Sequence, residues 1–280
     1  MKNKLFGFGL ILLVLATNAC QKDVSITPVP ERYQKLEKVA TLGGLKQMLH
    51  HASGAIGITN LKPFGPESLL SGGGPSEVFA SFSAEEGRAT FGALMIQNTI
   101  LTPSTYDYYQ SGAEERATIQ GYFGATQSVK LLDVEGASEA AILVEDIYLP
   151  KELFVHDPIE RGRDYLAKTS TIHWNPDPHN TNGVFILIDF LPEGEENAGR
   201  FNSDFVSHRK LIYTEDDGEY QLQVTDFNKI PDGAYVSLLV GRGDYVETTG
   251  SNGRTYLVYS LTGATAWFQV MGNDALDGAQ

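Results

Sequence analysis

The stretch VFILIDF, residues 184–190, decides the fold class, because Asp189 is the only polar residue in it. Successive side chains of an extended chain point to opposite faces, so its even-numbered residues share one face, with Phe185 and Leu187 on the other. A strand that is apolar on both faces is buried on both faces. The sequence therefore predicts a central strand covered by other layers on both sides.

Short strand patterns flank this stretch along the chain. The candidate strands are 169–174, 210–214, 220–224, 235–240, 254–260 and 265–270. Turn dipeptides that accept positive φ separate them, namely Asn182-Gly183, Asp217-Gly218, Asp232-Gly233 and Asn252-Gly253. About seven short strands at this spacing indicate an antiparallel sandwich over residues 165–272.

A second set of strand patterns occupies residues 75–150. Its candidate strands are 78–83, 90–97, 106–110, 117–123, 128–134 and 140–148. The sequence SGGGP, residues 71–75, breaks the chain before them and predicts a domain boundary. Apolar residues recur at three- and four-residue spacing over 33–51, interrupted by Gly43-Gly44, so we expect one or two short helices there.

One motif narrows the architecture of residues 165–272. The sequence DDGEYQL, residues 216–222, resembles the tyrosine corner of immunoglobulin domains through Asp216, Gly218 and Tyr220, with Leu222 where antibody domains carry cysteine. In that motif the ring is buried and its hydroxyl bonds a backbone group upstream. Trp174 is the candidate core indole. That resemblance covers residues 165–272. Together with the strand patterns of both halves, it leads us to expect an all-β protein of two tandem antiparallel immunoglobulin-like β-sandwiches, 75–150 and 165–272, behind the short helical segment.

The first residues have the pattern of an export signal. Lys2 and Lys4 precede twelve uncharged residues, 5–16. At about 1.5 Å per helical residue these cover roughly 18 Å, less than the ~30 Å hydrocarbon core of a membrane. A basic start and a short apolar stretch favour a secretory signal over a membrane span or a buried helix.

Cys20 is the only cysteine in the chain. Its surroundings resemble a bacterial lipoprotein signal, which implies removal of residues 1–19 and lipidation of Cys20 at the start of a tether and helical segment, 20–74. Thr17 departs from the leucine common in that pattern, and ordinary cleavage after Ala19 is the alternative. The sequence QKD, residues 21–23, resembles a signal that sends some Bacteroidota-type lipoproteins to the cell surface, so we expect an outer-membrane lipoprotein exposed on the cell.

Composition limits the partners. The formal net charge is −14 and the pI is near 4.8, so the chain repels phosphate backbones and anionic lipid headgroups. We therefore expect no nucleic acid partner and a membrane attachment supplied by acyl chains. With 42% hydrophobic residues the composition is that of a globular protein.

Motifs for catalysis and metal binding are weak. There is no G-x-S-x-G elbow, and six histidines are spread along the chain. His173 and His179 lack a third zinc ligand nearby, and the acidic runs 216–219 and 193–196 are read as turns, with adventitious calcium left open. The tripeptide Arg242-Gly243-Asp244 is a chance match to an integrin motif. We predict no catalytic residue, no metal, no cofactor and no enzymatic activity.

Two tyrosines suggest an alternative function. A strand over 106–110 places Tyr106 and Tyr108 on one face, where exposed rings stack on sugars. The two halves, through SFSAEEGRATFGALMIQN and IHWNPDPHNTNGVFILIDF, resemble paired sandwich domains of uncharacterised Bacteroidota-type surface lipoproteins. We expect a non-catalytic cell-envelope lipoprotein that displays β-sandwich domains for binding, adhesion or assembly, with glycans or other envelope proteins as candidate partners. The alternative is a glycan-binding surface lipoprotein of a polysaccharide-uptake system.

Overall fold

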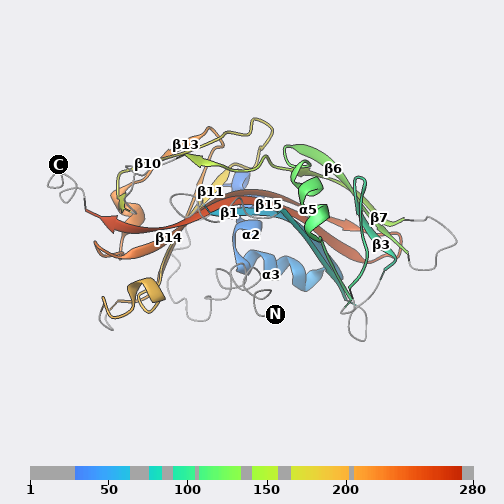
Figure 1. Cartoon of the computed structure of the whole chain (residues 1–280), viewed down its shortest axis with the longest axis horizontal. Helices are drawn as coiled ribbons and strands as arrows, with labels where there is room; N and C mark the ends of the chain where they lie inside the picture. Colours follow the sequence, from blue (N-terminus) through green and yellow to red (C-terminus); the bar gives the residue numbers. More distant parts are fainter. Residues whose placement is uncertain are drawn as a thin grey trace.

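The centre of the protein is one eight-stranded sheet (Figure 1). The computed structural model describes residues 29–63, 76–83, 91–104, 107–133, 141–156, 165–201 and 205–272. The strands run in the order β12 (His208–Thr214), β11 (Val184–Phe190), β14 (Tyr235–Thr249), β15 (Thr255–Met271), β1 (Gly54–Pro63), β2 (Ser76–Phe82) and β5 (Tyr108–Gln110), and β9 (Tyr165–Ala167) also pairs with β15. The stretch VFILIDF is β11. It has a strand on each side and every residue is buried, so the predicted strand covered on both faces is confirmed.

The sheet is shared by the two halves of the chain. β1 pairs in parallel with β15 along its whole length, and β2 pairs with β1. At about 3.3 Å per residue, the 17 residues of β15 span roughly 55 Å, enough to serve both ends. The expectation of two separate, purely antiparallel sandwiches is therefore corrected to one mixed sheet common to both.

Two smaller sheets cover one face of the shared sheet at its opposite ends (Figure 1). One has three strands, β13 (Glu219–Gln221), β10 (Thr171–Trp174) and β8 (Val155–His156); the other has four, β4 (Thr99–Leu101), β3 (Ala93–Ile96), β6 (Ala125–Leu132) and β7 (Ala141–Leu149). The even-numbered residues of β15 enter both cores. Tyr256 and Val258 pack in the four-stranded end, and Phe268 and Val270 in the three-stranded end.

Helices cover the opposite face (Figure 1). They are the 3₁₀ turn η2 (Glu31–Tyr33), α2 (Gln34–Ala40) and α3 (Leu42–His51). Leu36 and Met48 contribute to a third core with Phe185, Leu187 and Leu257 of the sheet. The two short helices are confirmed, but the chain breaks at Thr41, whose hydroxyl oxygen accepts the Gly44 N–H at 3.0 Å.

One strand prediction is wrong and one strand was missed, each for an identifiable reason. Residues 117–123 were expected to be extended, yet most of them belong to α5 (Ala113–Gln120), where Glu114 and Glu115 favour the first helical turn and Ile119 is buried. β1 was missed because glycines interrupt its pattern. Gly57 lies under the Tyr259 ring, and a β-carbon there would approach that ring to 2.5 Å. The glycine makes this strand possible by letting the ring pack on the backbone.

The turn dipeptides of the C-terminal half behave as predicted. All four glycines have positive φ, at Gly183, Gly218, Gly233 and Gly253. Within the described ranges, no helix is both long and apolar enough to cross a membrane.

Candidate functional site

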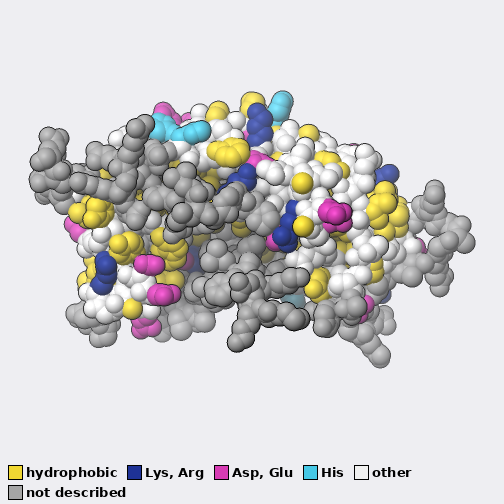
Figure 2. All heavy atoms as spheres, in the orientation of Figure 1, with side chains coloured by type: hydrophobic (Ala, Val, Ile, Leu, Met, Phe, Trp, Pro, Cys, Tyr) yellow, Lys and Arg dark blue, Asp and Glu magenta, His cyan; other side chains and the backbone are white. Residues whose placement is uncertain are grey.

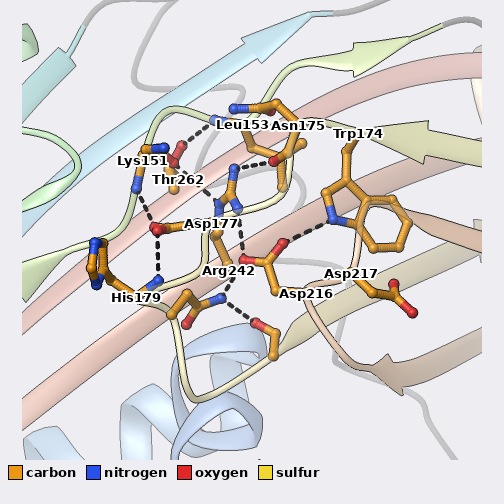
Figure 3. Close-up of polar contacts among 12 residues, drawn as sticks. Lys151, Leu153, Trp174, Asn175, Asp177, His179, Asp216, Asp217, Arg242 and Thr262 are labelled. Atoms are coloured by element: carbon orange, nitrogen blue, oxygen red, sulfur yellow. Dashed lines mark hydrogen bonds and ion pairs between the residues drawn. The ribbon is translucent and has the colours of Figure 1, made fainter.

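The segment 150–154 leads from β7 to β8 and lies against the central sheet between the two sandwich cores. Buried polar side chains gather around it, and Figure 3 shows most of them. We call this cluster the polar seam; it comprises the backbone of Lys151, Glu152 and Leu153 and the side chains of Tyr148, Trp174, Asn175, Asp177, Asn180, Asp216, Arg242 and Thr262. A buried charge needs hydrogen-bond or ion-pair partners, so the partners of Arg242, Asp216 and Asp177 are described in turn.

Arg242 of β14 is the centre of the seam, and none of its surface reaches solvent. Its Nη1 donates to Asp216 Oδ2 at 2.7 Å. Its Nε donates to the Lys151 carbonyl at 3.1 Å, and its Nη2 to the carbonyls of Glu152 and Asn175 at 3.4 and 3.0 Å (Figure 3). The guanidinium of Arg242 therefore binds the segment 150–154 to both the central sheet and the loop after β10.

Asp216 completes this ion pair. Its side chain is 2% exposed, and it also accepts from Trp174 Nε1 at 2.9 Å and from Asn180 Nδ2 at 2.8 Å (Figure 3). Gly218, with φ of +103°, turns the chain so that its carbonyl accepts the Trp174 N–H at 2.8 Å. Asp216 and Gly218 thus place the indole of Trp174 in the core of the three-stranded end, where the sequence predicted it.

Tyr220 differs from a tyrosine corner. Its ring is half-buried against the core, but its hydroxyl donates to Asp226 Oδ2 at 3.2 Å, in the 3₁₀ turn η5 (Val224–Phe227). The predicted upstream backbone acceptor is wrong, because η5 follows β13 at once and brings a carboxylate within reach. Burial and the adjacent Asp226 raise the pKa of Tyr220 to about 12.

Asp177 anchors the other side of the seam. Both of its carboxylate oxygens lie within hydrogen-bonding distance of the Tyr148 hydroxyl, at 2.9 and 2.8 Å. It also accepts the backbone N–H groups of Lys151 at 2.8 Å and His179 at 3.1 Å (Figure 3). Burial and this carboxylate raise the pKa of Tyr148 above its ordinary range, so the phenol stays protonated as a donor.

The polar groups of the seam bond to one another. Buried side-chain polar atoms that lack a partner in the described residues belong to other positions, such as Asn60, Arg116 and Tyr213. Lys62 of β1 adds an ion pair to Glu152 and lies over the Phe154 ring at 4.5 Å. Arg242 neutralises Asp216, whereas the Asp177 carboxylate is held by neutral donors. The hydrogen bonds of the seam join the two ends of the molecule.

The structure scatters the other predicted functional residues. Cys20 and Tyr106 lie outside the described residues. The Tyr108 ring is half-buried, 5.7 Å from the ring of Phe79, on the edge strand β5. The free stacking platform expected from the sequence therefore lacks support at Tyr108, and glycan binding stays a prediction.

The weaker motifs also acquire structural roles. The integrin-like tripeptide is unavailable to a partner at Arg242, which is fully buried. Asp216, considered as a calcium ligand, bonds three protein donors instead. The ring of His179 lies 6.5 Å from that of Tyr148, whereas His173 lies beside Glu219. Among the residues that the structure describes, no three His, Cys, Asp or Glu side chains form a group that could hold a metal ion.

His208, at the start of the edge strand β12, gives the fold a testable pH dependence. Burial, Lys229 and Lys210 lower its pKa below the usual 6.5, although Asp189 opposes them. The unfolded chain then binds more protons just below pH 6.5, so this histidine destabilises the fold increasingly as the pH falls below that value. We expect the unfolding free energy to drop less between pH 7.5 and 5.5 in His208→Gln than in the wild type, measured by urea denaturation. Equal drops would contradict the assignment.

Comparisons with known proteins do not assign the chain to a family. No family model matches the chain, and no curated protein matches it. Among solved structures, it aligns with a crystal structure of a DUF3823 family protein from Bacteroides ovatus ATCC 8483, over 78% of this chain and 98% of that one. The sequence identity is 10% and the TM-score is 0.20, and a likeness this weak says nothing about the site or its role.

Proposed function

We propose that this protein is a non-catalytic cell-envelope lipoprotein, anchored through acyl chains on Cys20, that displays its β layers for binding, adhesion or assembly. The observation that carries the proposal is the position of the only cysteine, four residues after the uncharged stretch 5–16. Lipidation gives this thiol a role. Each buried methylene of an acyl chain contributes about 0.8 kcal/mol, and two chains hold a protein at a membrane durably. The sequence QKD, residues 21–23, supports display on the cell surface.

The structure supports a role in display in two ways. The buried ion pair of Arg242 and Asp216 is committed to holding the fold. Aromatic side chains are exposed at the end of the central sheet, on Trp267 of β15 and Tyr165 of the neighbouring β9, and such residues are enriched at protein interfaces. Trp174 and Leu222, buried together in the three-stranded end, support interpreting residues 165–272 as an immunoglobulin-like half.

Lipidation is tested by metabolic labelling with radioactive palmitate in cells that express the full chain. We expect the wild type to be labelled and recovered with membranes. Cys20→Ser should carry no label and should leave the membrane fraction, because it has lost the site of acylation. Ser25→Ala, a substitution in the same segment, should behave as the wild type. If Cys20→Ser stays as firmly membrane-bound as Ser25→Ala, the proposed anchor is wrong.

A further inference from the structure

Three polar side chains form a row across the three-stranded sheet. In the register of that sheet His173 of β10 lies opposite His156 of β8 on one side and opposite Glu219 of β13 on the other. Residues opposite each other on paired strands share a face. The neighbouring Trp174 points into the core, so this face is turned outward, and all three side chains are exposed. Figure 2 shows histidine side chains on the surface where Figure 1 places β10 and β13.

The spacing in this row suits a metal ion. Directly opposite residues on antiparallel strands have β-carbons about 4.5–5.5 Å apart, and a zinc–imidazole bond is about 2.0–2.1 Å. Two opposed imidazoles can therefore reach one ion between them. Glu219 Oε2 lies 3.5 Å from Nδ1 of His173. A carboxylate on one ring nitrogen leaves the other nitrogen, Nε2, as the ligand and fixes the orientation of the ring.

We propose that His156 and His173 bind a divalent transition-metal ion that prefers imidazole, such as Zn²⁺ or Cu²⁺, with Glu219 orienting His173. Two protein ligands leave the remaining positions to water, so the site is open and exchanges its ion readily. This differs from a site with three converging protein ligands. Packing gives no competing reason for the row, because an exposed pair such as His173 and Glu219 contributes only about 0–1 kcal/mol to stability.

The other described histidines lack this arrangement and supply a control. His50 and His51 have ring centroids 5.3 Å apart, but they are consecutive residues of α3, and consecutive residues of a helix do not face each other. His208 is half-buried, and His179 packs against Tyr148. His50→Ala combined with His51→Ala therefore removes two surface imidazoles without touching the row.

The test is isothermal titration calorimetry of the full chain with ZnCl₂, repeated with CuCl₂, at pH 7.5. Every protein carries Cys20→Ser, so that no thiol competes and failure of this site leaves the lipidation proposal unaffected. We expect one saturable site. His156→Ala and His173→Ala should each abolish it, Glu219→Gln should weaken it about tenfold, and the His50/His51 double variant should bind as the parent does. Urea denaturation in EDTA should give the same midpoint for all variants.

Three results would overturn the proposal. The first is the absence of saturable binding of either ion to the parent protein. The second is unchanged affinity in His173→Ala or in His156→Ala. The third is a loss in the His50/His51 double variant as large as in those two. Parental affinity in Glu219→Gln would remove the orienting role assigned to that carboxylate.

Discussion

Replacement of Arg242 by Met should lower the free energy of unfolding by about 3–5 kcal/mol, because the variant leaves the Asp216 carboxylate buried without its counterion. The methionine also fails to donate to the carbonyls of Lys151, Glu152 and Asn175, which would then lose their partner in a region closed to solvent. Because Arg242 joins the segment 150–154 to the central sheet, the substitution should destabilise both ends of the molecule. Urea denaturation at pH 7 measures it.

Two variants make this result specific to the buried ion pair. Arg32→Met removes a charge from the exposed pair of Arg32 and Glu215, and should cost less than about 1 kcal/mol. Combining Arg242→Met with Asp216→Asn removes the stranded charge and should recover part of the loss. If Arg242→Met costs no more than Arg32→Met, the polar seam does not stabilise the fold as described.

The second large effect is expected at Phe82 of β2. Its ring makes edge contacts with Phe91, Tyr109 and Tyr256, at centroid distances of 5.0, 5.6 and 5.9 Å. Phe82→Ala empties the middle of this cluster and should cost about 3–5 kcal/mol. The loss includes both the transfer of the ring to water and the cavity that remains. Thermal and urea denaturation should agree on its sign.

A surface substitution provides the comparison for Phe82. Ile100 of β4 has 57% of its surface exposed, so Ile100→Ala should change the unfolding free energy by no more than about 0.5 kcal/mol. Phe82→Leu keeps most of the apolar volume and should fall between the two. A Phe82→Ala protein as stable as Ile100→Ala would show that the aromatic cluster is not a tightly packed core.

Local patterns in the sequence were enough to predict the elements in which buried residues recur at the regular spacing of a strand or a helix. VFILIDF is apolar at almost every position, and β11 is indeed covered on both faces. The two short helices follow from spacings of three and four residues, and the turn glycines follow from their need for positive φ. Trp174 lies in the core as expected. In each case the signal lies within a few residues of the feature that it predicts.

Tertiary structure decided how the strands combine. In the sequence, the glycines of β14 and β15 look like the ends of strands, but both strands continue through them. Each of these glycines is needed because a side chain or a neighbouring backbone lies too close for a β-carbon. The Phe185 ring lies where a β-carbon of Gly241 would be, at 2.4 Å. The sequence does not indicate that approach, since Phe185 and Gly241 meet only through the register of β11 with β14.

The same reasoning applies to the charged and chemical groups. Arg242, within GRGD, has the local pattern of an exposed turn, and only the packing of β14 against the loop between β12 and β13 brings it to Asp216 and buries both side chains. His156, His173 and Glu219 come from three separate strands and align only in the register of the small sheet. Periodicity determines which face of a segment is buried, because that depends on neighbouring residues. Which residues from distant segments come into contact depends on the register of the paired strands and on how the sheets and helices pack. Only the tertiary structure gives that information.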